Sequence, residues 1–283
     1  MKNWRDMVAY KRFRWLDHTG KKYFHGKSYT ALTSFAVDDV LSLFVRGGEA
    51  TPAIRLWTHP ETVVLGIPDS RLPYLKEGVR MLSENGYYTI VRNSGGLAVA
   101  LDDGVLNMSL VLPDMKRISI YDCYEAMVSF VRFVLRDLTD DIEAYEIVGS
   151  YCPGDYDLSI RGRKFAGISQ RRVRDGAAIQ IYLDVEGKGR ERAELIRDFY
   201  EVAKKDAETK FTYPVVNPAV MASLSELLGM DLTVSDMKKR VQNALEHLTD
   251  EIVTEDFSIG ELEQFEKRYN QMVKRNEEIA EMQ

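Results

Sequence analysis

The chain has 283 residues, of which 45% are hydrophobic and 29% charged, and it carries a net charge of −6. This composition is that of an ordinary soluble chain with enough apolar residues for a sizeable core. No apolar run reaches membrane-spanning length without charges, and an acidic protein is poorly suited to coating nucleic-acid phosphates. The N-terminus lacks the continuous apolar stretch of a signal peptide, so we expect a cytoplasmic protein with no membrane or nucleic-acid partner.

Helix and strand signals alternate through the first two thirds of the sequence. Apolar spacing predicts a helix over residues 31–45, stopped at Gly47-Gly48, and a strand pair over 53–68. A second helix is predicted over 72–85, ending at Gly86. Three strands in a hairpin series are expected over 87–113, with turns at Gly95-Gly96 and at Asp102-Asp103-Gly104.

The remaining elements follow the same logic. Residues 119–138 have the apolar stripe of an amphipathic helix, and residues 156–185 read as strands joined by Arg-Gly and Asp-Gly hairpin turns. After residue 186 the pattern is mostly helical, and we expect residues 251–283 to form a charged helix at the surface. Because strands are expected only over about 50–186, the sequence predicts an α+β fold, with a mixed or antiparallel sheet, packed helices and a helical C-terminal portion.

Most familiar catalytic motifs are missing. The four histidines are scattered, without H-E-x-x-H or paired cysteine spacing, so no metal site is predicted. The sequence also lacks a G-x-S-x-G elbow, a Walker loop and a G-x-G-x-x-G run. We therefore expect neither a metal nor a nucleotide cofactor.

Two segments remain as candidates for chemistry. In "VRNSGGLAVALDDG" the glycines allow close approach of a backbone to a ligand, and Arg92 supplies a cation beside them. In "GSYCPGDYDLSIRGRKFAGISQ" the Pro153-Gly154 turn keeps Cys152 off a regular element, and Lys164 follows twelve residues later. A thiol with a pKa of ~8.5 is mostly protonated at neutral pH, and a nearby ammonium would favour its thiolate. Residue patterns alone leave Cys152 open as a nucleophile or a structural cysteine, whereas Cys123, in the predicted 119–138 helix, reads as a buried hydrophobe.

The two segments carry a family resemblance. "RNSGGLAVALDDGVLNMSLVLP" and "GRKFAGISQRR" resemble, in this order and at this separation, the two conserved blocks of the biotin/lipoate protein ligase and octanoyltransferase superfamily. The resemblance covers about residues 30–250, which would form the catalytic domain, with the helix of residues 251–283 packed on it or extending from it. The cysteine segment is most similar to the cysteine-dependent amidotransferases of protein lipoylation. These enzymes move octanoyl groups from the glycine cleavage system H protein to other lipoyl domains, such as those of 2-oxoacid dehydrogenases.

This resemblance implies roles for individual residues. Cys152 would carry the acyl group as a thioester in an ATP-independent ping-pong reaction, and Lys164 would lower the pKa of its thiol and help to move the proton of the attacking amine. The residues that would line the acyl site are Arg92, Ser94, Gly95, Gly96, Asn107 and Gly167. The basic stretch "QRRVR", with Arg171, Arg172 and Arg174, would dock acidic lipoyl domains.

Three departures from the ligase pattern argue against an acyl-adenylate site. Ligases have two adjacent arginines, three glycines and a histidine in the first block, where this chain has Val91, Leu97 and Leu101. The alternatives to the amidotransferase are an enzyme that takes octanoyl groups from acyl carrier protein, an ATP-dependent lipoate ligase, and a non-catalytic acyl-binding assembly factor.

Overall fold

The computed structural model describes residues 4–45, 51–113 and 115–283. Its largest element is an eight-stranded mixed sheet in the order β13-β1-β4-β8-β12-β11-β10-β9. The strands are β1 (Arg12–His18), β4 (Ala53–Trp57), β8 (Val105–Leu112), β9 (Ile142–Ala144), β10 (Leu158–Ile160), β11 (Arg163–Val173), β12 (Gly176–Asp184) and β13 (Glu251–Val253). Strands β13, β1 and β4 run parallel, and the pairings from β4 to β9 are antiparallel.

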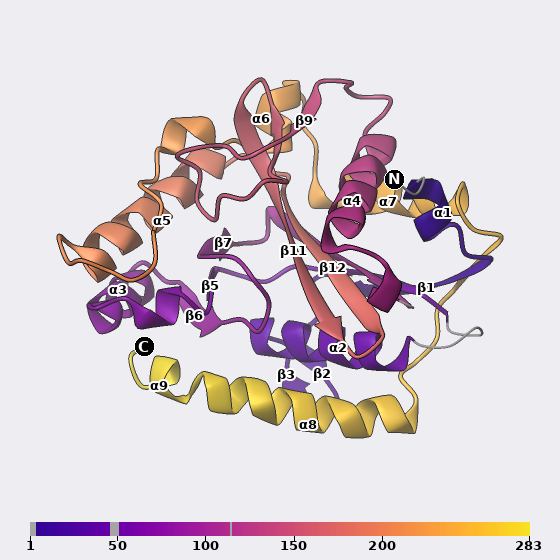
Figure 1. Cartoon of the computed structure of the whole chain (residues 1–283), viewed down its shortest axis with the longest axis horizontal. Helices are drawn as coiled ribbons and strands as arrows, with labels where there is room; N and C mark the ends of the chain where they lie inside the picture. The colour runs from indigo at the N-terminus through magenta and orange to yellow at the C-terminus, as the bar shows by residue number, and fades with distance from the viewer. Residues whose placement is uncertain (1–3, 46–50, 114) are drawn as a thin grey trace.

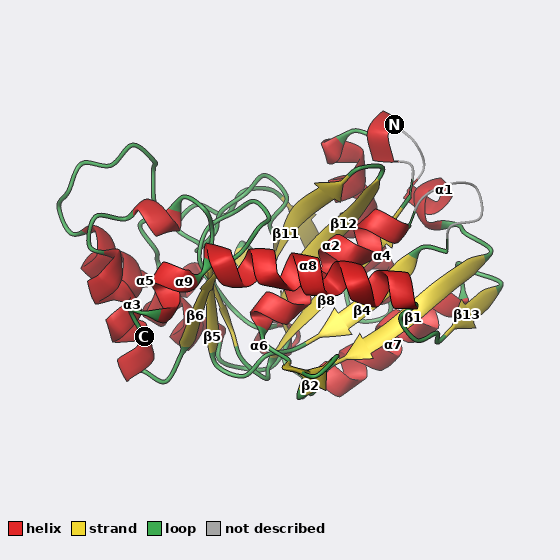
Figure 2. Ribbon diagram, turned by 90° about the horizontal axis from the view of Figure 1, so that it is seen from below, coloured by secondary structure: helices red, strands yellow, loops and turns green. Residues whose placement is uncertain are grey.

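Helices cover both faces of this sheet (Figure 1). One face packs against α1 (Trp4–Val8), α4 (Ile120–Val134), α6 (Leu224–Leu228) and α7 (Val234–Glu246). The other face packs against α2 (Ala31–Phe44), with α8 (Ile259–Arg275) lying across α2 (Figure 2). The short α9 (Glu277–Ala280) follows α8, and a two-stranded hairpin, β2 (Tyr23–Phe24) and β3 (Lys27–Ser28), precedes α2.

A second, three-stranded sheet stands beside the large one. It has the order β6-β5-β7, with β5 (Thr62–Leu65) in the centre, β6 (Tyr88–Val91) parallel to it and β7 (Val99–Leu101) antiparallel. Helices α3 (Leu75–Glu84) and α5 (Gly189–Lys204) pack against each other next to it. Its core is continuous with the core under α2.

The expected α+β class is confirmed, and four details of the sequence prediction are wrong. Residues 251–283 are not one helix, because they contain β13, α8 and α9. Strands are not confined to residues 50–186, because β1 and β13 also belong to the large sheet. Strands β4 and β5 do not pair with each other, because they belong to different sheets. The strands of residues 87–113 are not a hairpin series, because β5 lies between β6 and β7, and β8 pairs with β4 and β12. The predicted helix stop at Gly47-Gly48 lies outside the described residues.

Helix α8 shows how the C-terminal segment is attached. Ser258 caps the helix by accepting a hydrogen bond from the Glu261 N–H, and the Glu261 carboxylate accepts one in return from the Ser258 N–H. The other oxygen of Glu261 pairs with Arg14 of β1 at 2.6 Å, and both side chains are buried. Phe265 and Met272, on the same helix, enter the core over α2. Residues far apart in the chain therefore close this face of the sheet.

No helix in the described part of the chain is long and apolar enough to span a membrane.

Candidate active site at Cys152

Cys152 lies on the loop between β9 and β10, with its thiol turned toward the small sheet. The Leu97 backbone N–H donates to its Sγ at 3.1 Å, and the Arg92 guanidinium lies at 3.5 Å from the same atom. The side chain is partly buried and lines a cavity of about 250 Å³. The sulfur therefore faces both a backbone N–H donor and a cation at the wall of this cavity.

Gly96 makes this approach possible. Its φ is +101°, and a Cβ at this position would lie 2.1 Å from an Arg92 nitrogen and 2.9 Å from the Cys152 Sγ. Any side chain would therefore displace either the guanidinium or the sulfur. Gly95, its neighbour, has open space around a Cβ and a backbone that other residues adopt readily. Of the predicted pair, Gly96 is the glycine that the geometry requires.

The turn containing Gly96 is supported from below. A Cβ on Gly66 would lie 1.9 Å from the Gly96 carbonyl oxygen, so the two backbones touch. The Tyr200 hydroxyl accepts from the Ala98 N–H at 3.2 Å and donates to Asp69 at 2.9 Å, and Asp69 also accepts from the Gly66 N–H at 2.8 Å. Burial raises the pKa of Asp69 to about 6. No sequence motif marks these supporting residues.

Lys164 meets Cys152 through the main chain. The Lys164 ammonium is fully buried and donates to the carbonyl oxygens of Tyr151 and Cys152, each at 2.9 Å. It also forms an ion pair with Asp157 at 2.8 Å. Burial raises the pKa of Asp157, and the Lys164 charge opposes that rise. The structure thus brings the two predicted residues together, and the cation beside the sulfur itself is Arg92.

The hydrogen bonds from Lys164 hold a residue whose backbone is strained. Cys152 has φ +46°, in the left-handed region that costs an L-residue about 1–2 kcal/mol. The two carbonyl groups that Lys164 binds are those of Cys152 and the residue before it, so the ammonium fixes the turn that aims the thiol at Leu97. Asp157, which is close to Cys152 in sequence, compensates the charge of the lysine.

The cavity runs from the thiol toward the core under α2. Its inner part is lined mainly by apolar side chains, including Phe35, Trp57, Val64, Val99 and Leu101. Its outer part is lined by Tyr121, Tyr124 and Tyr156 from α4 and the cysteine loop, and Tyr121 is 63% exposed. The cavity therefore has an aromatic opening, a thiol along its wall and an apolar interior, an arrangement suited to a linear acyl chain.

The other predicted acyl-site residues divide between two cavities. Asn107 and Gly167 line the first cavity, and Gly167 leaves space for the Tyr182 ring, which a Cβ would meet at 2.8 Å. Ser94 is buried and lines a second cavity of about 520 Å³, on the side of the turn where Arg71 and Phe211 lie. Gly95 and Gly96 border both cavities.

The three arginines predicted for docking differ in exposure. Arg171 is paired with Asp39 at 2.8 Å. Arg172 donates to the carbonyl oxygens of Met115 and Ile118 at 2.7 and 2.9 Å, so it holds the turn before α4. Arg174 is exposed, at a hairpin position with φ +56°. Arg171 and Arg172 nevertheless line the second cavity together with Arg71.

Cys123 occupies a different environment. Its side chain is fully buried on α4 and contacts the Met115 sulfur at 3.7 Å. Burial raises the pKa of this thiol. Its assignment as a buried hydrophobe is confirmed.

Known proteins resemble this chain over nearly its whole length. Residues 30–246 match the family model of the lipoyl protein ligase A/B catalytic domain. An octanoyl-[GcvH]:protein N-octanoyltransferase from Oceanobacillus iheyensis is 61% identical over 277 residues, which cover 98% of this chain and 99% of that protein. A lipoyl-[GcvH]:protein N-lipoyltransferase from Listeria monocytogenes is 47% identical over 253 residues, which cover 89% and 91% of the two chains.

Solved structures agree on the fold. A lipoate-protein ligase A bound with ATP superposes with a TM-score of 0.68 at 17% identity, covering 92% of this chain and 94% of that one. A bi-partite lipoate protein ligase from Thermoplasma acidophilum gives a TM-score of 0.65 at 18% identity, covering 92% and 91%. The resemblance noted in the sequence is thereby confirmed, and the chain belongs to the lipoyl protein ligase A/B catalytic domain family.

Proposed function

We propose that this protein is an acyltransferase of protein lipoylation that moves an octanoyl group between lysines through an acyl-Cys152 thioester. The donor is the octanoylated glycine cleavage system H protein, and the acceptors are the lipoyl domains of 2-oxoacid dehydrogenase complexes. The names of the relatives support the donor and the reaction class. The observation that carries the chemistry is the Cys152 thiol, which meets the Leu97 N–H and the Arg92 guanidinium at the wall of an apolar cavity.

The first half-reaction breaks the donor amide. The Cys152 thiolate attacks the carbonyl carbon of octanoyl-lysine, the C–S bond forms and the C–N bond breaks, and the donor lysine leaves as an amine after taking up a proton. Negative charge moves from sulfur to the carbonyl oxygen during the attack. The Leu97 N–H and the Arg92 guanidinium are the donors in contact with the sulfur, so they interact favourably with the negative charge that it carries before the attack.

The second half-reaction reverses the first with a new amine. The lysine amine of the acceptor domain attacks the thioester, the C–N bond forms, the C–S bond breaks and the thiolate returns while the amine loses its proton. One amide is broken and an equivalent amide is made, so the reaction is close to balance and needs no ATP. Lys164 acts in both steps through the two carbonyl groups that it binds, by keeping Cys152 in its strained, productive conformation.

The cavity supports an acyl chain as the group transferred. Burial of an alkyl chain contributes about 0.8 kcal/mol per CH₂, so the apolar interior favours binding of the octanoyl tail. The partner domain reaches the cavity at its aromatic opening, where Tyr121 is exposed. The arginines of the second cavity, on the far side of the Gly95-Gly96 turn, supply positive charge for an acidic domain. Both cysteines are free thiols, a state that the reducing cytoplasm maintains.

A transfer assay without ATP tests this function. Octanoyl-H protein and octanoyl-acyl carrier protein are offered in turn, with an unmodified lipoyl domain as acceptor, and acyl transfer is followed by mass spectrometry. We expect transfer from the H protein in the absence of ATP. Transfer from the carrier protein alone would overturn the donor assignment, and a requirement for ATP would overturn the mechanism.

A further inference from the structure

Two rows of side chains cross the large sheet on the face covered by α2. The register of the strands aligns one residue from each of β4, β8, β12 and β11 in each row. The first row consists of Trp57, Asn107, Tyr182 and Gly167. The second row is two residues away from the first on each strand, so it lies on the same face of the sheet. It consists of Arg55, Ser109, Gln180 and Ser169. All four residues of the first row line the acyl cavity.

Cys152 lies at the Gly167 end of the first row. A Cβ on Gly167 would be 3.6 Å from the Lys164 Cε, and the ammonium of the same lysine is 2.9 Å from the Cys152 carbonyl oxygen. Trp57 lies at the opposite end of the row, three strand spacings from Gly167, so the backbones of these two residues are roughly 14 Å apart. A saturated eight-carbon acyl group on Cys152 fits within that length, and its tail then points toward the Trp57 ring.

The Trp57 ring is held on several sides. Its indole N–H donates to the Ser109 hydroxyl at 3.2 Å, and the Arg55 guanidinium carbon lies 5.2 Å from its ring centroid. The Phe35 ring packs edge-on at 5.8 Å between centroids, and the His59 ring lies at 5.2 Å. Only 3% of the residue is exposed. An aromatic ring with this many contacts cannot swing aside to admit a longer chain without breaking some of them.

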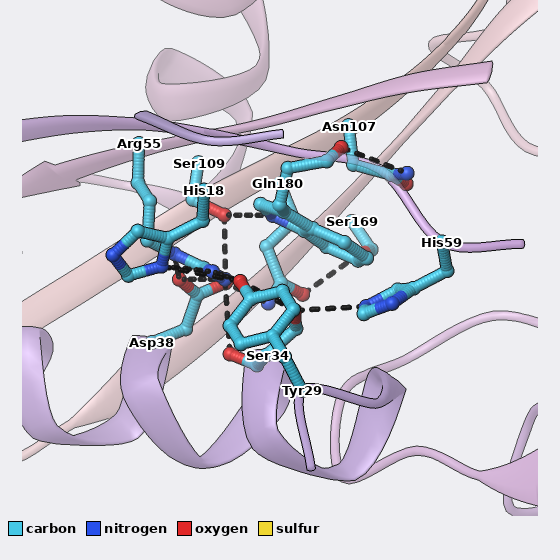
Figure 3. A network of polar contacts seen from close by, with 11 residues as sticks. His18, Tyr29, Ser34, Asp38, Arg55, His59, Asn107, Ser109, Ser169 and Gln180 are labelled. Atoms are coloured by element: carbon cyan, nitrogen blue, oxygen red, sulfur yellow. Dashed lines mark hydrogen bonds and ion pairs between the residues drawn. The ribbon is translucent and has the colours of Figure 1, made fainter. Parts of the chain in front are cut away.

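A buried polar network fixes the groups that hold Trp57 (Figure 3). The Asp38 carboxylate accepts from Ser109 at 2.7 Å, from Arg55 at 2.8 Å and from Gln180 at 2.6 Å. Arg55 and Ser109 are fully buried, and Arg55 also donates to the Tyr29 hydroxyl at 2.7 Å. A buried ion pair stays favourable only when its remaining hydrogen bonds are made, as they are here. None of these residues contacts the Cys152 thiol, so the network has no role in the chemical steps.

We propose that Trp57 is the end wall of the acyl site and sets the longest acyl chain that the protein transfers, with Ser109, Arg55 and Asp38 as its positioning residues. This inference rests on the proposed function, because it takes the acyl chain to be attached to Cys152. The ligand class is a saturated, unbranched acyl group. A chain that fills the cavity ends at the indole, and a chain that is longer than the cavity collides with it.

The test compares chain lengths within one protein. A lipoyl-type domain is acylated on its lysine with hexanoyl, octanoyl, decanoyl or dodecanoyl groups, and the rate of acyl-Cys152 formation is measured by intact-mass spectrometry. For the native protein we expect decanoyl and dodecanoyl transfer to be at least tenfold slower than octanoyl transfer. For Trp57→Leu we expect the decanoyl-to-octanoyl ratio to rise about tenfold or more, because the cavity gains the volume of the indole. The ratio is internal to each variant, so a general loss of stability cancels.

Two further variants make the result decisive. Trp57→Phe keeps a ring packed against Phe35 but removes the indole N–H and part of the wall, so it shifts the ratio in the same direction. Trp15→Leu is the matched control. Trp15 is on the neighbouring strand β1 and packs against the opposite face of the sheet, so we expect this variant to keep the native decanoyl-to-octanoyl ratio. A native protein that accepts dodecanoyl as readily as octanoyl, or tryptophan variants with unchanged ratios, would overturn the end wall alone. A native protein that forms no octanoyl adduct would overturn the proposed function instead.

Discussion

The Lys164 ammonium contacts Cys152 at its carbonyl oxygen, at 2.9 Å, while the thiol of the same residue faces Leu97 and Arg92. The lysine therefore acts on the backbone of the nucleophile, and the arginine acts on its sulfur. This division separates two kinds of variants, those that loosen the cysteine turn and those that disturb the surroundings of the sulfur.

Replacement of Lys164 tests the first kind. We expect Lys164→Met to lose at least a hundredfold in the rate of Cys152 acylation, because the left-handed turn loses its clamp. The variant also leaves the Asp157 carboxylate buried without its cation, which costs about 3–5 kcal/mol of unfolding free energy. Urea unfolding and acylation kinetics measure the two effects.

A double variant separates these effects. Lys164→Met combined with Asp157→Asn removes both charges, so we expect part of the lost stability to return while acylation stays low. Recovery of acylation together with stability would show that the lysine serves only to neutralise Asp157.

Replacement of Gly96 tests the second kind of variant, which disturbs the surroundings of the sulfur. We expect Gly96→Ala to reduce Cys152 acylation by a hundredfold or more, since its Cβ would meet the Arg92 guanidinium and the sulfur, and since φ +101° is strained for alanine. Gly95→Ala, one residue earlier, has open space around its Cβ and serves as the comparison, with a much smaller loss. Equal losses in the two variants would contradict the specific role of Gly96.

Much of the site was predictable because two sequence blocks carry it. The glycine turn, Cys152 and Lys164 are marked by sequence motifs, and the structure brings all of them together around one cavity. Gly66 and Trp57 were not predicted, since neither has a motif and each acts through a contact made across the fold. The ion pair of Asp157 with Lys164 was not predicted either, because it too depends on how the chain folds.

The fold divides in a similar way. Helices α2, α3 and α4 follow from local apolar spacing, which a sequence displays directly. Strand partners depend on contacts between distant segments, so the separation of β4 from β5 could not be read from adjacent residues. Strand β1 was not predicted because its charged residues obscure the alternation of apolar and polar positions. One of them, Arg14, is buried only because Glu261, 247 residues later, pairs with it.

The buried histidines predict a pH dependence of stability. Burial, reinforced by the Arg55 charge, lowers the pKa of His59 from its usual 6.5 to about 3. Below pH 6.5 the unfolded chain takes up a proton on this residue and the folded protein does not, so the contribution of His59 is present above pH 6.5 and lost as pH falls. Relative to His59→Gln, we expect the native protein to lose about 1.4 kcal/mol of unfolding free energy between pH 7.5 and pH 5.5.

Urea unfolding of both proteins at the two pH values checks this. Groups that both proteins share cancel in the comparison, including Asp69, whose raised pKa has the opposite effect on stability. A difference between native protein and variant that stays constant with pH would contradict the account of His59.

Charge reversal tests the docking of acceptor domains. Arg71 and Arg174 are exposed, so Arg71→Glu combined with Arg174→Glu changes the surface charge without breaking a buried contact. We expect kcat/KM for an acidic lipoyl domain to fall about tenfold at low ionic strength, and the difference from the native protein to shrink at high salt. Lys274→Glu, on the exposed side of α8, is the control and keeps the native salt dependence. Native kinetics in the double variant would remove these arginines from docking.

The acyl-enzyme itself gives the most direct measurement. The protein is mixed with octanoyl-H protein without ATP, and its intact mass and the modified peptide are determined. We predict one octanoyl adduct, located on Cys152, that disappears in Cys152→Ser and persists in Cys123→Ser, because Cys123 is fully buried away from the cavity. Transfer to the acceptor domain with no adduct on the native protein, or an adduct that survives in Cys152→Ser, would contradict the central claim.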